Sequence, residues 1–259
     1  MPTFEVAGAE LAVALSDEGG HPVVQLHGLT SSRARDRVLN LDLGRGLSGT
    51  RLLRYDARAH GRSTGRSVAE DYRWQNLADD LLRLLDHWFP GERVHGVGPS
   101  MGAATLVHAA SLEPDRFTGL TLMVPPTAWE TRPAQAAIYG AAAALIESDG
   151  IDAFLAVSRM SAPPPATVGG PQTRPDVPDA LLPSLFRGAA LSDLPAAEAV
   201  ARIEVPTTIL AWVDDPGHPL STAESLVEVL PQATLTVART PEEVDAWPEV
   251  LRADVDRRS

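Results

Sequence analysis

The chain has 259 residues, which fits one α/β domain with an inserted subdomain, and its composition, 44% hydrophobic and 22% charged, is typical of a soluble globular protein. All 22 basic residues are arginine and there is no cysteine; this excludes a Schiff-base or P-loop lysine, a thiolate nucleophile and a cysteine-ligated metal. The net charge of −12, with no basic run, argues against nucleic acid or an anionic membrane as a partner.

The ends and the apolar stretches of the chain predict its location. The first twenty residues lack the positive start and apolar core of a secretion signal. The most apolar stretch, 134–146, contains Gln135 and is too short to span a bilayer. We therefore expect a cytoplasmic protein, and the exclusive use of arginine suggests a GC-rich bacterial genome. The oligomeric state stays open.

The first half of the chain alternates short apolar runs with amphipathic segments, the pattern of βαβ units around a buried, mostly parallel sheet. Two opening runs predict a hairpin, and the later runs predict core strands. The expected strands are 4–6, 10–15, 23–26, 50–55, 94–98, 120–124, 207–212 and 233–238, and the expected helices between them are 72–89, 100–112 and 221–230.

Between the strands at 120–124 and 207–212 the alternation stops. Helices are expected at 134–148, 151–160, 180–188 and 195–203, around an irregular proline-rich loop at 162–178. An insertion of this kind over the strand ends is typical of a lid. We expect a hydrolase-like core built from 1–125 and 204–259, with a helical lid at 126–203.

The segment Gly98–Gly102 reads Gly-Pro-Ser-Met-Gly, a G-x-S-x-G sequence between a predicted strand and a predicted helix. A serine nucleophile on such a tight turn needs glycine two residues before and two after it, because side chains there would collide with neighbouring backbone. The turn also places Ser100 at a helix start, whose free amides favour negative charge. An ordinary glycine-rich turn is the alternative, but the flanking elements favour a nucleophile.

A second loop supports acyl-transfer chemistry. His27-Gly28-Leu29 follows a predicted core strand, where such an enzyme needs backbone N–H groups that bind an oxyanion. The backbone amides of Leu29 and Met101 are the expected donors. A third segment, Asp56–Ser63, follows the next strand.

Together these motifs, with the Tyr72–Leu81 helix and the 205–219 segment, resemble the α/β-hydrolase superfamily, in its esterase, lactonase and carbon–carbon hydrolase branch. The resemblance covers nearly the whole chain and implies the α/β-hydrolase fold. It also implies that Asp56, Arg58 and His60 shape a loop and do no chemistry themselves, and that His27 does the same. Ala59 replaces the family's usual glycine, a change that we expect a modest backbone adjustment to absorb. The other histidines, His21, His87, His95 and His108, are expected at the surface or in the core.

The acid of the catalytic triad is expected after the 207–212 strand. The family pattern there is G-x-x-D-x-x-x-P; Trp212 stands at the glycine, Asp215 at the acid and Pro219 at the end. Asp214 is the second choice for the acid, and a solvated turn is the alternative interpretation.

The base is where the sequence departs from the family. The resemblance places a histidine after the last strand, yet no histidine follows His218. Because a serine without a base is a weak nucleophile, we expect His218 to replace it and to lie within hydrogen-bond reach of Ser100. A histidine that caps the next helix or lies exposed is the alternative. A further risk is that Asp215 cannot reach the far nitrogen of a histidine in its own loop.

The predicted function is a serine hydrolase that cleaves an ester, thioester or lactone of a small organic molecule through an acyl-enzyme at Ser100, with no metal or organic cofactor. A degenerate small-ligand-binding protein of the same fold, or a cyclase or lyase using the same pocket, remains an alternative. The Gly98–Gly102 turn is called the nucleophile elbow. Serine at the elbow argues against dehalogenase and epoxide-hydrolase chemistry, where the family nucleophile is aspartate. Four aromatic residues of the lid either contact an apolar acyl group or form the lid's own core; they are Trp129, Tyr139, Phe154 and Phe186.

Overall fold

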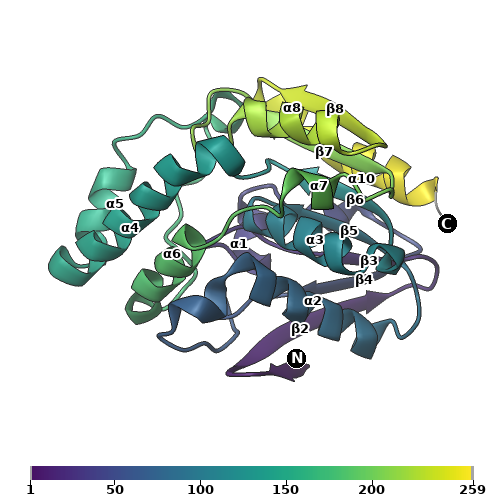
Figure 1. The fold of residues 1–259 in the computed structure, drawn as a ribbon, viewed down its shortest axis with the longest axis horizontal. Helices are drawn as coiled ribbons and strands as arrows, with labels where there is room; N and C mark the ends of the chain where they lie inside the picture. Colours follow the sequence, from purple (N-terminus) through teal and green to yellow (C-terminus); the bar gives the residue numbers. More distant parts are fainter. Residues whose placement is uncertain (1, 258–259) are drawn as a thin grey trace.

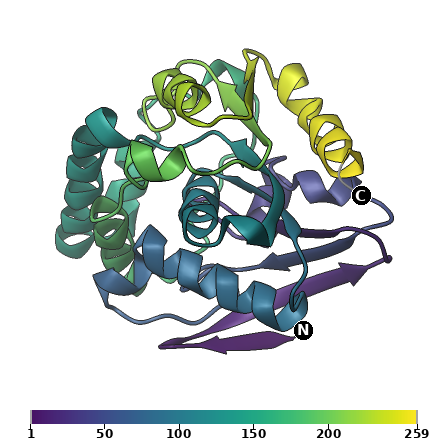
Figure 2. The ribbon, with the colours of Figure 1, turned by 45° about the vertical axis from the view of Figure 1, so that its right-hand side comes forward.

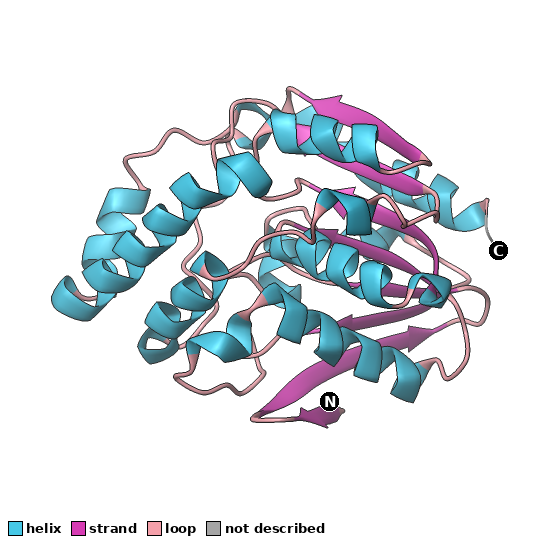
Figure 3. Cartoon of the chain, viewed as in Figure 1, coloured by secondary structure: helices cyan, strands magenta, loops and turns pink. Residues whose placement is uncertain are grey.

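Eight strands form one sheet in the order β1-β2-β4-β3-β5-β6-β7-β8. The computed structural model describes residues 2–257. The first two strands form the predicted hairpin, β2 pairs antiparallel with β4, and all remaining pairs are parallel (Figure 3). The strands are β1 (Thr3–Val6), β2 (Ala9–Asp17), β3 (Pro22–Gln25), β4 (Arg51–Tyr55), β5 (Val94–Pro99), β6 (Phe117–Met123), β7 (Thr207–Trp212) and β8 (Ala233–Ala238).

Most helices lie where the apolar spacing predicts them, within a few residues. The helix expected at 195–203 is only one turn, Ala197–Val200; Val200 and, three residues after it, Ile203 are buried. The helix at 33–38 was not predicted, because charged residues dominate it and no apolar period marks it. The helices are α1 (Arg33–Val38), α2 (Trp74–Trp88), α3 (Met101–Leu112), α4 (Arg132–Asp149), α5 (Ile151–Ser158), α6 (Leu182–Ala190), α7 (Ala197–Val200), α8 (Leu220–Val229), α9 (Pro241–Asp245) and α10 (Trp247–Asp256).

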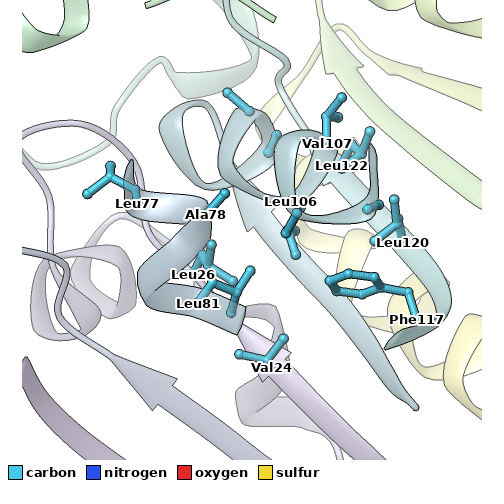
Figure 4. Close-up of a cluster of buried hydrophobic side chains, with 14 of the residues drawn as sticks. Val24, Leu26, Leu77, Ala78, Leu81, Leu106, Val107, Phe117, Leu120 and Leu122 are labelled. Carbon is cyan, nitrogen blue, oxygen red and sulfur yellow. The ribbon is translucent and has the colours of Figure 1, made fainter. Parts of the chain in front are cut away.

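Helices cover both faces of the sheet (Figures 1 and 2). Successive strand residues point to opposite faces, so Val24 and Leu53 pack with α2, α3 and α8, whereas their neighbours Val23 and Leu52 pack toward α10. Figure 4 shows part of the first cluster, where Leu106 of α3 lies among side chains of the sheet and α2. These two apolar layers hold the strands in place between them, and they thereby set the position of the loops at the strand ends.

The segment between β6 and β7 holds α4 to α7, and α4, α5 and α6 form a group at one side of the sheet (Figure 1). Their buried side chains pack with Ala59 and Tyr72 of the core and against Leu29. Since Leu29 and Ala59 follow β3 and β4, this segment lies at the carboxyl edge of the parallel strands. Within residues 2–257, no helix combines the length and apolar character needed to cross a membrane.

A buried ion pair fastens the loop after β4 to α2. The Arg58 guanidinium donates to both carboxylate oxygens of Asp80, at 2.5 and 2.7 Å, and both side chains are almost fully buried. Arg58 also donates to the Ala7 carbonyl at 2.5 Å. Removing one partner of such a pair leaves a buried charge without compensation.

Arg58→Ala is therefore expected to lower the free energy of unfolding by about 3–5 kcal/mol, because it strands the Asp80 carboxylate. The matched control is Arg66→Ala. That change breaks the Arg66–Asp71 pair, in which the arginine is half exposed, and is expected to cost less than about 1 kcal/mol. Urea denaturation of both variants measures the difference, and equal losses would contradict this role of Arg58.

Candidate active site

Ser100 sits on the turn between β5 and α3 with φ 51° and ψ −112°. This positive φ lies in a region that residues other than glycine rarely occupy. Ser100 is partly exposed, although the residues on either side of it are buried. The turn therefore presents the hydroxyl at the start of α3, at the carboxyl edge of the sheet.

The two glycines of the motif are required by close packing. A Cβ on Gly102 would lie 2.9 Å from the Leu26 Cβ and 3.0 Å from the His27 carbonyl oxygen. A Cβ on Gly98 would lie 3.0 Å from the same Leu26 atom. The steric reason inferred from the sequence thus has a specific partner, the end of the neighbouring strand and the loop that follows it.

His218 lies beside Ser100, as expected from the sequence. The His218 Nε2 is 2.8 Å from the Ser100 Oγ, and the His218 Nδ1 is 2.8 Å from the Asp215 Oδ2. With Nδ1–H donating to the carboxylate, Nε2 is the nitrogen that accepts the serine hydroxyl. The three side chains form one continuous hydrogen-bonded chain.

A tight turn allows acid and base to come from one loop. The His218 amide donates to the Asp215 carbonyl at 3.1 Å, and the Gly217 amide donates to the Asp215 Oδ1 at 2.9 Å. The second bond is a local side-chain-to-backbone contact typical of aspartate in turns. The turn folds the imidazole back over the carboxylate, so the concern that Asp215 would not reach the far nitrogen does not apply.

Asp215, and not Asp214, is the carboxylate that contacts the His218 imidazole. Burial alone would raise the pKa of the Asp215 carboxyl, but hydrogen bonds from His218, Trp212 and Gly217 outweigh it and lower the pKa to about 2. The carboxylate is therefore ionised at neutral pH. Asp214 is exposed and has a left-handed backbone, φ 58°.

The Gly28-Leu29 loop passes next to the elbow. A Cβ on Gly28 would lie 3.7 Å from the Ser100 Cβ, so the backbone of this loop runs alongside the serine. Met101 is the first residue of α3, where an amide has no acceptor within its own helix. The two amides predicted as oxyanion donors thus belong to backbone on either side of Ser100.

Two buried histidines build this loop, in agreement with the structural role that the resemblance implies. The His27 Nδ1 donates to the Gly28 carbonyl at 2.8 Å, and its Nε2 accepts from the Ala57 amide at 2.9 Å. His60 likewise accepts from the Thr30 amide at 3.2 Å, and the two rings lie 4.8 Å apart. Burial lowers the pKa of both imidazoles, that of His60 to about 3, so both are neutral hydrogen-bonding spacers.

The remaining motif residues make hydrogen bonds and packing contacts with other parts of the fold. Asp56 accepts from the Arg33 guanidinium and amide, all at 3.0 Å, and from the Arg62 amide at 3.1 Å. Ala59 has a left-handed φ of 63°, a region that favours glycine, and its methyl group is buried against the insert; the expected backbone adjustment relative to the family stays a prediction. The other histidines bond or pack elsewhere: His21 with Thr118, His95 with Thr121, His108 with the Asp193 carbonyl and His87 with Phe4 and Trp88.

Sequence reasoning missed two contributors to the site. Trp212 was noted only as a substitute for glycine, yet its indole Nε1 donates to the Asp215 Oδ2 at 2.8 Å. Asp176, near the end of the proline-rich loop, joins two core loops: its amide donates to the Thr30 carbonyl at 2.8 Å, and its carbonyl accepts from the Gly61 amide at 2.7 Å. The unusual Trp212 was a signal that could have been followed, whereas nothing in the sequence marks Asp176.

Comparison with known proteins agrees with this geometry. The family model described as "alpha/beta hydrolase fold" matches residues 21–143. A 3-oxoadipate enol-lactonase of Acinetobacter baylyi is 29% identical over 71% of this chain and 68% of its own length. The chain is thus similar to the α/β-hydrolase superfamily in sequence and has its fold.

Solved structures support the same fold. A carboxylesterase structure from Nitrososphaera gargenis superposes with a TM-score of 0.80 at 16% identity, covering 100% of both chains. The enol-lactonase of Burkholderia xenovorans superposes with a TM-score of 0.77 at 20% identity, covering 98% of this chain and 100% of that one. At these identities the likeness concerns the fold.

One buried carboxyl, that of Asp36, lies next to the Gly28-Leu29 loop, and it predicts that the free energy of unfolding depends on pH. Burial raises the pKa of Asp36 to about 7, although Ser31 donates a hydrogen bond to its Oδ1. Its Oδ2 has no partner in the described part of the chain. Between the unfolded pKa near 4 and about 7, the folded chain keeps a proton that the unfolded chain has released, so the free energy of unfolding falls as pH rises through this window.

Asp36→Asn removes this titration and is expected to flatten the fall in stability between pH 5 and pH 8 by at least about 1 kcal/mol. Chemical denaturation of both proteins at the two pH values measures it. If wild type and variant lose the same stability across this range, Asp36 is not the buried acid responsible.

Proposed function

We propose that this protein is a serine hydrolase that cleaves a carboxylic ester, thioester or lactone of a small organic molecule through an acyl-enzyme at Ser100. The observation that carries the proposal is the chain of two 2.8 Å contacts from the Ser100 Oγ through the His218 imidazole to the Asp215 Oδ2. A serine on a strained turn, with an imidazole that can accept its proton and an ionised carboxylate on the far side of that imidazole, is the arrangement that activates a hydroxyl for acyl transfer.

In the proposed first step, the Ser100 Oγ attacks the substrate carbonyl carbon and its proton passes to the His218 Nε2. The carbonyl oxygen becomes an oxyanion, which the Leu29 and Met101 amides and the start of α3 stabilise. The imidazolium is stabilised by the Asp215 carboxylate on its other nitrogen. His218 then gives the proton to the leaving oxygen or sulfur as the acyl-enzyme forms.

In the second step, water replaces the leaving group. His218 accepts a proton from the water as it attacks the acyl carbon, and the second oxyanion uses the same two amides. Collapse of this intermediate breaks the bond to the Ser100 Oγ, which takes the proton back from His218. The products are the carboxylic acid and the free enzyme, and for a lactone the alcohol remains in the same molecule.

The substrate class rests on two supports. The relatives reported above are named enol-lactonase and carboxylesterase, names that denote cleavage of a lactone or a carboxylic ester. The proposed lid, residues 126–203, lies against the loops after β3 and β4 beside the elbow. Such a segment would limit substrates to molecules that fit beneath it.

The aromatic residues of the proposed lid favour one of the two roles left open by the sequence. Phe186 stacks on Tyr139 at 5.9 Å and meets Phe154 at 5.3 Å, so these three rings pack with one another. Trp129 is fixed separately, with its indole nitrogen donating to the Pro195 carbonyl at 3.0 Å. The lid aromatics therefore serve mainly as its own core, and they give little information about the acyl group.

A non-catalytic ligand-binding protein of the same fold is the second candidate. The observation that favours it is the lack of any histidine after the last strand. The His218–Ser100 contact weighs against it, because a pocket residue without a catalytic role has no need of an imidazole and a carboxylate in line.

Covalent labelling by a fluorophosphonate probe separates the two candidates. The hydrolase account predicts stoichiometric labelling of the wild-type chain at Ser100, seen by mass spectrometry, and complete loss in Ser100→Ala, which should stay folded because it removes only one oxygen. Labelling at Ser111, a serine at the C-terminal end of α3, or no labelling at all, would support a binding protein instead.

His218→Ala is expected to lower the labelling rate constant at Ser100 by at least about a hundredfold, the lower range for the loss of a general base. The matched control is His87→Ala, whose ring packs on Phe4 and Trp88 at the other side of the core and should leave the rate unchanged. A His218→Ala variant that labels within a few fold of wild type would show that some other group accepts the proton.

A further inference from the structure

We propose that Trp212 is a positioning residue of this active site, whose indole N–H holds the carboxylate oxygen that the His218 imidazole depends on. The inference rests on the proposed serine-hydrolase function and extends it to a residue outside the triad. Trp212 stands at the position where the family pattern has glycine, so the contact belongs to this chain and does not follow from membership of the family.

The contact is direct. Trp212 is the last residue of β7, and its Nε1 lies 2.8 Å from the Asp215 Oδ2, the oxygen that is also 2.8 Å from the His218 Nδ1. The other oxygen, Oδ1, is held by the Gly217 amide at 2.9 Å. Of these three donors, only the indole comes from outside the turn, and it comes from β7, a fully buried strand that pairs with β6 and β8.

The indole is itself held in one orientation. Its ring stacks on that of Trp247 with centroids 5.9 Å apart and planes at 18°, and both rings are buried. Trp247 begins α10 and belongs to the segment after β8, where the family carries its catalytic histidine. In this chain that segment contributes packing that fixes Trp212.

An acid and a base that lie on the same short turn need a hydrogen-bond donor from outside that turn, such as the Trp212 indole. Asp215 and His218 sit in a short, partly exposed turn, with 15% and 24% of their side chains exposed. A carboxylate there has other rotamers and water within reach. A donor fixed to the sheet selects the rotamer that faces the imidazole, and it also shares the negative charge of the Oδ2 with His218.

The titratable groups around this pair are few. Asp214 lies on the same turn, and Tyr139 on α4 faces the Asp215 charge with Arg132 5.4 Å from its ring. Burial raises the pKa of Tyr139, so it stays neutral across the range in which a histidine titrates. Tyr139 therefore does not contribute to an acid limb in the rate of Ser100 labelling.

The test is the rate constant of fluorophosphonate labelling, measured from pH 5 to pH 9 for Trp212→Phe and wild type. Loss of the N–H is expected to slow labelling about tenfold on the plateau, the order expected for a hydrogen bond to a charged group. The midpoint of the acid limb should move to higher pH, because an Oδ2 freed of the indole holds the imidazolium more strongly.

The matched control is Trp247→Phe. It removes the same volume from the same stacked pair, but the Trp247 indole nitrogen has no hydrogen-bond partner in the described part of the chain. Because the phenyl ring of this variant can still pack on Trp212 and the Trp212 N–H is retained, its midpoint is expected to lie closer to wild type than that of Trp212→Phe, and thermal denaturation of both variants measures their packing losses separately. In an Asp215→Asn background, Trp212→Phe should add less than about a twofold effect, since the charge that it positions is gone.

A wild-type rate and midpoint in Trp212→Phe, a midpoint that falls, or identical changes in both tryptophan variants would overturn the role of Trp212. So would a full tenfold loss that persists in the Asp215→Asn background. Failure of the wild-type chain to label at Ser100 would instead overturn the proposed function on which this inference rests.

Discussion

The hydrogen bond between the Asp215 carboxylate and the His218 imidazole is the contact on which the site depends, because it orients the only histidine that touches Ser100 in the described residues. It forms within four residues of one chain segment. Acid and base therefore move together as a unit, and their alignment with the serine depends on how firmly the turn is attached to β7. The Trp212 indole provides that attachment from the strand, and the Gly217 amide holds the carboxylate within the turn.

The rest of the site follows from the parallel sheet. The loops after β3, β5 and β7 carry the Gly28-Leu29 backbone, Ser100 and the Asp215–His218 turn, and parallel strands bring their carboxyl ends to one edge. Polar side chains that could have done chemistry are used to shape these loops: His27 and His60 tie backbone segments, and Arg58 pairs with Asp80. The insert contributes through Asp176, which joins the loops after β3 and β4 by two backbone hydrogen bonds.

The strands, the elbow and the position of Asp215 could be predicted from sequence because each depends on local patterns. Apolar runs set β3 to β7, and the glycines beside Ser100 report a steric need that the packing on Leu26 confirms. The contact of His218 with Ser100 could only be proposed, because a four-residue turn can adopt several geometries. The hydrogen bond from the Gly217 amide to the Asp215 Oδ1 selects the one seen here. No local sequence pattern predicts helix α1, the left-handed backbone of Ala59 or the contacts of Asp176, because these features depend on tertiary partners far away in the sequence.

The most direct measurement of the central claim is a crystal structure of the chain after reaction with a fluorophosphonate. The account predicts a phosphorus–oxygen bond at the Ser100 Oγ, a phosphoryl oxygen between the Leu29 and Met101 amides, and the His218 Nε2 in contact with the adduct while its Nδ1 stays on the Asp215 Oδ2. A crystal in which Ser100 is unmodified, or in which His218 has left Asp215 and points to solvent, would contradict it.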